Sequence, residues 1–134
     1  MTRNKEDEAV KTQRYNLEER LLGFAALNIK LIEEIHGTRA GNHVAGQLLR
    51  CATSPLANHA EAQAAESRDD FIHKLRICLK ELRETSRWLR LIRRVPLTDS
   101  PGQVDAVLDE ALELVRIFVK SIQTALAGGS PSDE

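Results

Sequence analysis

Residues 71–92 read FIHKLRICLKELRETSRWLRLI, and this stretch decides the fold class. Apolar or small side chains recur along it at alternating spacings of four and three residues, which is the pattern of a helix in a bundle or a coiled coil. They are Phe71, Leu75, Cys78, Leu82, Thr85, Leu89 and Ile92. Ser67 precedes the run as an N-cap and Pro96 follows it, so the sequence predicts a helix over 68–94.

Three further stretches show helical periodicity. Asn16 and Glu19 form a capping-box pattern before the first, and Ser100-Pro101 is a start signal before the last. Pro55 lies inside the middle one, where its missing amide and its ring predict a kink or an interruption. The predicted helices extend over about 17–36, 40–66 and 101–127.

Length and composition fit a single all-α domain. The chain has 134 residues and 15.0 kDa, enough for one hydrophobic core, and its 4% aromatic content favours helix over sheet. Four amphipathic helices with short connections predict an antiparallel four-helix bundle. We expect a flexible polar lead over 1–15, the bundle over 16–128 and a polar tail over 129–134.

The last predicted helix carries an apolar side at the same alternation of spacings. We expect it to face the core through Val104, Leu108, Ala111, Val115, Phe118, Ile122 and Ala125. Further apolar residues lie outside the core-facing side of this helix and of the helix over 68–94. They are Ile77, Trp88, Leu91, Leu112, Val119 and Leu126. Since exposed apolar rows usually mark association, they predict a homo-oligomer, although a wide core is the alternative.

Charge is distributed unevenly along the chain. The formal net charge is −1, but residues 68–98 hold nine basic and four acidic side chains, whereas residues 99–134 hold two basic and seven acidic ones. A nearly neutral total therefore conceals one basic element and one acidic element, so the two are analysed separately from the net charge.

The basic element forms a stripe on the helix over 68–94. Its members are separated by three and four residues and face away from the predicted core. They are His73, Arg76, Lys80, Arg83, Arg87, Arg90 and Arg94. Arginine offers a bidentate fork to phosphate, so the stripe predicts contact with a nucleic-acid backbone. No aromatic residues alternate with these cations, so sequence-selective stacking on bases is not expected.

An ordinary solvated helix face is the alternative interpretation of the stripe. Glu81 and Glu84 lie beside it and can pair with Lys80 or Arg87, and the acidic helix over 101–127 can neutralise it from the side. The stripe would then serve ion pairing within the protein or between subunits.

No recognisable constellation for catalysis or cofactor binding occurs in the sequence. Glu33-x-x-His36 has the spacing of a di-iron ligand pair, but matching inward glutamates are missing from the other helices. Cys78 falls on the apolar seam, and no histidine has an obvious spacing to activate Cys51. We therefore expect no enzyme activity, no metal and no cofactor. Without a long apolar run or a secretory signal, we expect a cytoplasmic protein without a membrane partner.

The stretch 48–92 resembles the bacterial family of 23S rRNA-intervening-sequence proteins, also called S23-type proteins. The likeness rests on a set of positions in the two middle helices and extends over about 15–126. They are Ser54, Asn58, Ala60-Glu61-Ala62, Glu66-Ser67-Arg68, Phe71, Lys74-Leu75, Leu79-Lys80-Glu81, Glu84 and Trp88-Leu89.

The resemblance implies a small four-helix bundle that forms a homo-oligomer, with a pentamer expected. The family is also similar to the accessory proteins of diversity-generating retroelements, which implies nucleic acid and a reverse transcriptase as partners. It brings no catalytic residues. We therefore expect a non-enzymatic oligomeric bundle that binds an RNA or DNA backbone through the basic stripe; the alternative is a protein-interaction scaffold or accessory subunit without nucleic-acid contact.

Overall fold

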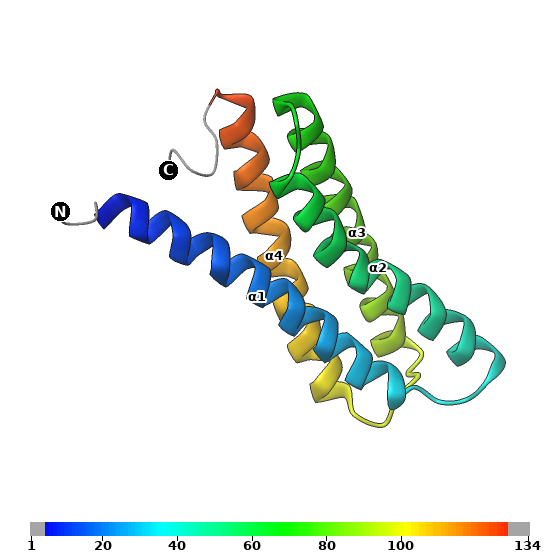
Figure 1. Ribbon diagram of the computed structural model, residues 1–134. Coiled ribbons are helices and arrows are strands. Elements are labelled where there is room, and N and C mark those ends of the chain that lie inside the picture. The colour runs from blue at the N-terminus through cyan, green and yellow to red at the C-terminus, as the bar shows by residue number, and fades with distance from the viewer. Residues whose placement is uncertain (1–4, 129–134) are drawn as a thin grey trace.

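The computed structural model describes residues 5–128, and side chains from residue 16 onward. Four helices fill this range: α1 Lys5–Glu33, α2 Arg39–Gln63, α3 Arg68–Arg94 and α4 Pro101–Leu126. They run up and down in turn and pack into a four-helix bundle (Figure 1), as the sequence predicts. Hydropathy gives none of these four helices the apolar length that crossing a bilayer requires.

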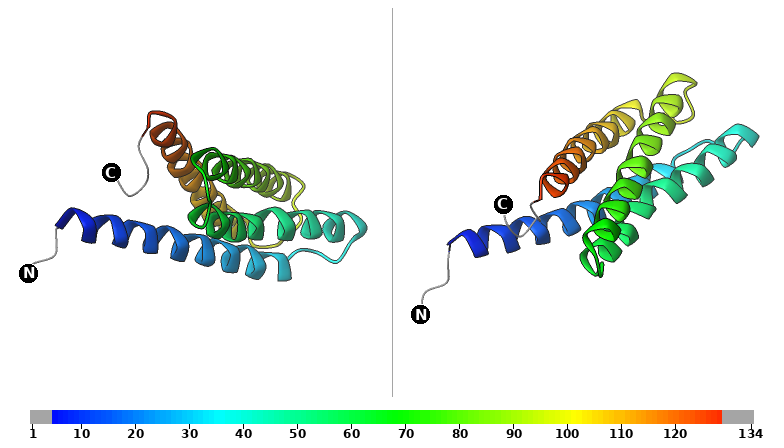
Figure 2. Two further views of the ribbon diagram at one scale, coloured as in Figure 1. Left: turned by 45° about the horizontal axis from the view of Figure 1, so that its top comes forward. Right: turned by 90° about the horizontal axis from the view of Figure 1, so that it is seen from above.

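The helices do not contribute equally to the bundle. The most extensive contacts join α3 to α2 and to α4, and the smallest interface joins α1 to α4. Figures 1 and 2 show α1 lying beside α2 at its carboxyl end, while its amino-terminal part diverges from the other helices. α3 therefore has neighbours on two sides and an outer face that no other described helix covers.

The helix boundaries correct the sequence prediction most clearly at the start of the chain. α1 begins at Lys5 and not at 17, so the helix includes residues 5–15, which were expected to precede it. That segment is rich in good helix formers and contains neither glycine nor proline, so the helix extends through it. Asn16 is consequently an interior residue and not a cap. The expectations for residues 1–4 and 129–134 lie outside the described residues.

The other boundaries agree within a few residues. α3 matches its predicted range, α1 ends at Glu33, α2 ends at Gln63 and α4 ends at Leu126. Pro55 is buried, and α2 continues across it without the interruption that the sequence allowed. The Cys78 thiol on α3 lies 3.7 Å from the Pro55 carbonyl oxygen, so this part of α2 packs directly on α3.

The core is largely the predicted one, with two positions of α4 displaced by one residue. On α3, Ile72 is buried and Phe71 is only half-buried. On α4, Val107 and Leu114 are buried where the sequence predicted Leu108 and Val115, which are half-buried. Both members of each adjacent pair on α4 are apolar, so periodicity alone does not select between them.

The connection from α1 to α2 is held against the loop between α3 and α4. The His36 amide donates to the Leu97 carbonyl at 2.8 Å, and the His36 ring lies 3.0 Å from the Asp99 carboxylate. Thr38 then caps α2 by accepting from the Gly41 amide at 3.0 Å. A Cβ atom at Gly41 would overlap the backbone carbonyl of His36, so this turn requires glycine.

Replacing Gly41 with alanine should destabilise the protein, because the displaced His36 carbonyl belongs to backbone. We expect a loss of about 2 kcal/mol or more, measured by thermal or urea unfolding. Gly46→Ala on the same helix is the matched control: its Cβ would meet nothing within 4 Å, so helix propensity should stabilise it by about 0.5–1 kcal/mol. Equal effects of the two substitutions would contradict the clash.

A second stability element is the buried imidazole of His59 on α2. His59 is 3% exposed, and its ring packs edge-to-face on Phe118 of α4 with centroids 6.2 Å apart. Its ring nitrogen Nε2 lies 3.4 Å from the Gln63 amide nitrogen. Burial lowers the pKa of His59, and the charge of Glu18 opposes this effect. The folded protein therefore favours the neutral imidazole.

Stability should fall as the pH decreases through about 6.5, the ordinary histidine pKa. Below that pH the unfolded chain binds a proton at His59 more readily than the folded chain does. The free energy of unfolding therefore falls by at most about 1.4 kcal/mol per pH unit. Melting temperatures at pH 7.5 and 5.5 check this prediction. The His59→Gln variant should lose much of the difference in melting temperature between the two pH values. The loss is partial because the other three histidines remain. An unchanged difference would refute the role of His59.

Candidate nucleic-acid interface

The structure brings every predicted member of the basic stripe to the outer face of α3. His73, Arg76, Lys80, Arg83, Arg87, Arg90 and Arg94 are all exposed. The core-facing residues of α3 lie on the other side of the helix, because a period close to 3.5 residues keeps the two sets apart. At a rise of about 1.5 Å per residue, the stripe is about 27 Å long from Arg76 to Arg94.

None of these cations has an ion-pair partner among residues 16–128. Glu81 and Glu84, the neighbours that the sequence offered as counterions, pair with Arg50 of α2. Arg50 donates to Glu81 at 3.1 Å and to both carboxylate oxygens of Glu84 at 2.7 Å. Donation from Arg50 lowers the pKa of Glu84. These carboxylates are therefore engaged on the side of α3 that faces α2.

The acidic residues of α4 do not neutralise the stripe either. Asp105 pairs with Arg93, which is not a stripe residue, at 3.1 Å. Glu110 pairs with Arg20 of α1 at 2.6 Å, and Glu113 lies 3.4 Å from an arginine of its own helix. Asp109 forms no ion pair within residues 16–128. The stripe consequently keeps its positive charge available to an external anion.

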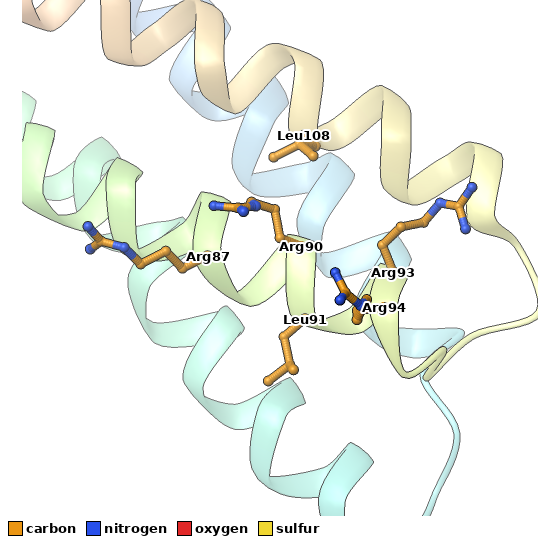
Figure 3. A pocket seen from close by; sticks show the side chains of 6 residues that line it. All are labelled: Arg87, Arg90, Leu91, Arg93, Arg94 and Leu108. Carbon is orange, nitrogen blue, oxygen red and sulfur yellow. The ribbon is translucent and has the colours of Figure 1, made fainter.

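Two shallow, open depressions lie along the stripe where α3 meets α4. The first is lined by Arg76, Leu79, Lys80, Arg83, Arg87 and Ile122. The second is lined by Arg87, Arg90, Leu91, Arg93, Arg94 and Leu108, and Figure 3 shows its four arginines extending from α3 while Leu108 comes from α4. Each depression combines guanidinium or ammonium groups with aliphatic side chains. Arg87 belongs to both, so the two are contiguous.

The predicted oligomer contacts separate into two groups. Leu91, Leu112 and Leu126 are exposed, whereas Ile77, Trp88 and Val119 are half-buried. Trp88 packs against the core, and its ring meets His43 of α2 edge-on with centroids 6.2 Å apart.

A further exposed apolar row lies on α1 and was not predicted from the sequence. Leu22 and Ile29 lie seven residues apart and are 50% and 43% exposed. Their spacing was the available signal, but α1 carries apolar residues on several sides, so the spacing alone did not separate this row from the core.

The buried thiols offer no nucleophile. Cys51 and Cys78 are fully buried, and burial raises the pKa of Cys51 to about 11 and that of Cys78 to about 12. Within the described residues, no three histidine, cysteine, aspartate or glutamate side chains come together as a metal site.

Both thiols should resist alkylation and disulfide reagents in the folded protein. At pH 8 the high pKa values leave at least about 100-fold less thiolate than in an ordinary cysteine, and burial blocks access as well. Titration with Ellman's reagent should detect both thiols only after unfolding in guanidinium. Rapid modification of a native thiol would contradict the burial of these side chains.

Several of the positions that suggested the family make polar contacts within one helix or between two helices. Lys74 of α3 pairs with Glu61 of α2 at 2.8 Å, and the Asn58 amide donates to the Ser54 hydroxyl at 2.9 Å. Ser67 caps α3, and Arg68 donates through Nε to the carbonyl of Ala125 of α4 at 3.0 Å. The polar set on α2 and α3 is therefore bracing between and within helices, which is how such sets fix register.

The fold and the site define a small four-helix bundle with an uncompensated cationic outer face. Residues 23–120 match the 23S rRNA-intervening sequence proteins, and the chain belongs to this family. A solved structure of a protein with unknown function from the S23 ribosomal protein family of Bacteroides thetaiotaomicron VPI-5482 is similar. It is 32% identical, with a TM-score of 0.74 over 81% of this chain and 99% of that chain. None of the curated proteins matches the chain.

Proposed function

We propose that the protein is a non-enzymatic, homo-oligomeric bundle that binds the phosphate backbone of nucleic acid through the basic stripe. The observation that carries this proposal is the absence of counterions for the stripe within residues 16–128. Exposed cations without partners can bind phosphate without breaking an ion pair of their own. Each phosphate that they neutralise releases condensed counterions, which favours binding.

Association between copies would strengthen this binding. The exposed apolar residues Leu112 and Leu126 support contacts with further copies of the chain, whereas Leu91 lines a depression of the stripe. A pentamer is the assembly that the resemblance implies. Several stripes on one assembly would bind the same polyanion with greater avidity than a single stripe.

A protein-interaction scaffold is the second candidate. The exposed row of Leu22 and Ile29 on α1 favours it, since an apolar row on the helix with the smallest interfaces is available to another protein. In that case the stripe would make ion pairs with a partner subunit, and nucleic acid would not bind.

Charge reversal on the stripe distinguishes these candidates. The Arg83→Glu/Arg87→Glu variant should weaken binding to labelled RNA or DNA by at least about 10-fold, because two phosphate contacts become repulsions. Fluorescence anisotropy measures the affinity, and light scattering measures the oligomeric mass, which should not change.

The matched control is Lys30→Glu/Lys120→Glu, which changes the net charge equally. Lys30 on α1 and Lys120 on α4 are exposed and lie outside the stripe. Equal loss of affinity in both variants would show that only net charge matters. Loss of mass in the stripe variant, with no nucleic-acid binding by the parent protein at low salt, would favour the scaffold.

A further inference from the structure

We infer that the ligand of the basic stripe is an unpaired, extended nucleic-acid strand rather than a duplex. This inference rests on the proposed function and narrows it to one class of nucleic acid. It follows from the shape of the stripe, from the side chains on the two flanks of α3 and from the two depressions.

The stripe is narrow and straight. At a period of 3.5 residues, Arg76, Arg83 and Arg90 form one row, and Lys80, Arg87 and Arg94 form a second row about 50° away around the helix. The two rows together form a narrow band of six permanent cations about 27 Å long, with one cation for roughly every 5 Å of helix axis.

A duplex fits this line poorly. Each strand of B-form DNA winds around the axis once per about 34–36 Å, so its phosphates meet a straight line of cations only where the strand crosses it. A stripe of about 27 Å therefore reaches two or three phosphate positions on a duplex. The remaining cations would face a groove.

Insertion of α3 into a major groove is disfavoured by its flanks. The major groove of B-form DNA is about 12 Å wide, so a helix inserted in it brings both of its flanks close to the bordering phosphate backbones. On one flank α3 presents Glu81 and Glu84 to Arg50, and on the other flank Arg93 is paired with Asp105. The major groove of A-form RNA is narrower still and does not admit side chains.

An extended single strand fits the same surface along its whole length. Its phosphates can follow the line of cations, while bases or sugars lie in the depressions against Leu79 and Ile122 or against Leu91 and Leu108. Guanidinium planes such as that of Arg87 can stack on bases. No aromatic side chain lines either depression, so every base should be accepted with similar affinity.

The test compares a single strand and a duplex of equal length in salt titrations. The probes are a labelled uridine oligomer of about twelve nucleotides and a labelled GC-rich duplex of about twelve base pairs. For the single strand, six neutralised phosphates predict a slope of log K against log salt of about −4. For the duplex, two or three contacts predict a slope of about −2 to −3 and at least about 10-fold weaker binding near physiological salt.

Neutral variants at the two ends of the stripe show whether one strand spans it. Arg76→Gln and Arg94→Gln should each reduce the slope for the single strand by about 0.7, while Lys30→Gln on α1 should leave it unchanged. These residues are exposed, so the fold should persist and can be checked by circular dichroism. An end variant that leaves the slope unchanged would overturn the extended arrangement.

The possible failures are distinguishable. Duplex binding as tight as single-strand binding, with an equal or steeper slope, would overturn the inference and leave the proposed function in place. If neither probe binds at about 50 mM salt, both the inference and the proposed function fail.

Discussion

The pairing of Arg50 with Glu81 and Glu84 divides the charged side chains of α3 into two sets. Carboxylates on the side of α3 that faces α2 are held by a guanidinium from α2, at distances of 2.7–3.1 Å. The outer cations are thereby left without the counterions that lie closest to them in sequence. One contact thus joins the two helices with the largest shared interface and leaves the outer face of α3 strongly basic.

Much of the fold could be predicted because heptad spacing reports directly on burial. The range of α3 follows from Ser67 and the apolar seam, and the structure confirms it. Two core positions of α4 could not be predicted, because at each of them adjacent residues such as Val107 and Leu108 are both apolar and only tertiary packing selects between them. The start of α1 was missed because Asn16 is a cap residue by type, while its position inside a longer helix depends on what precedes it.

The position of the stripe was predictable, but the absence of counterions for it was not. In the sequence, Glu84 lies four residues after Lys80 and three residues before Arg87, so a pair within α3 is as reasonable as a pair with Arg50. The outcome depends on how closely α2 approaches α3, which is a tertiary property. Several positions that carry the family resemblance form ion pairs between α2 and α3. They are Glu61, Lys74, Glu81 and Glu84. Of all the positions that carry the family resemblance, only Lys80 belongs to the stripe. Membership of the family therefore informs about the packing of the helices more than about the outer face of α3.

The concentration of free cations on one face of a chain with net charge −1 gives the molecule a large electrostatic dipole and almost no monopole. At distances beyond the Debye length of about 8 Å, a polyanion experiences neither attraction nor repulsion of note. Closer in, the field would produce a torque that turns the outer face of α3 toward the polyanion. Encounter would therefore select an orientation before any contact forms. Collisions through the other faces would be unproductive and brief, so a polyanion would be captured by the outer face of α3.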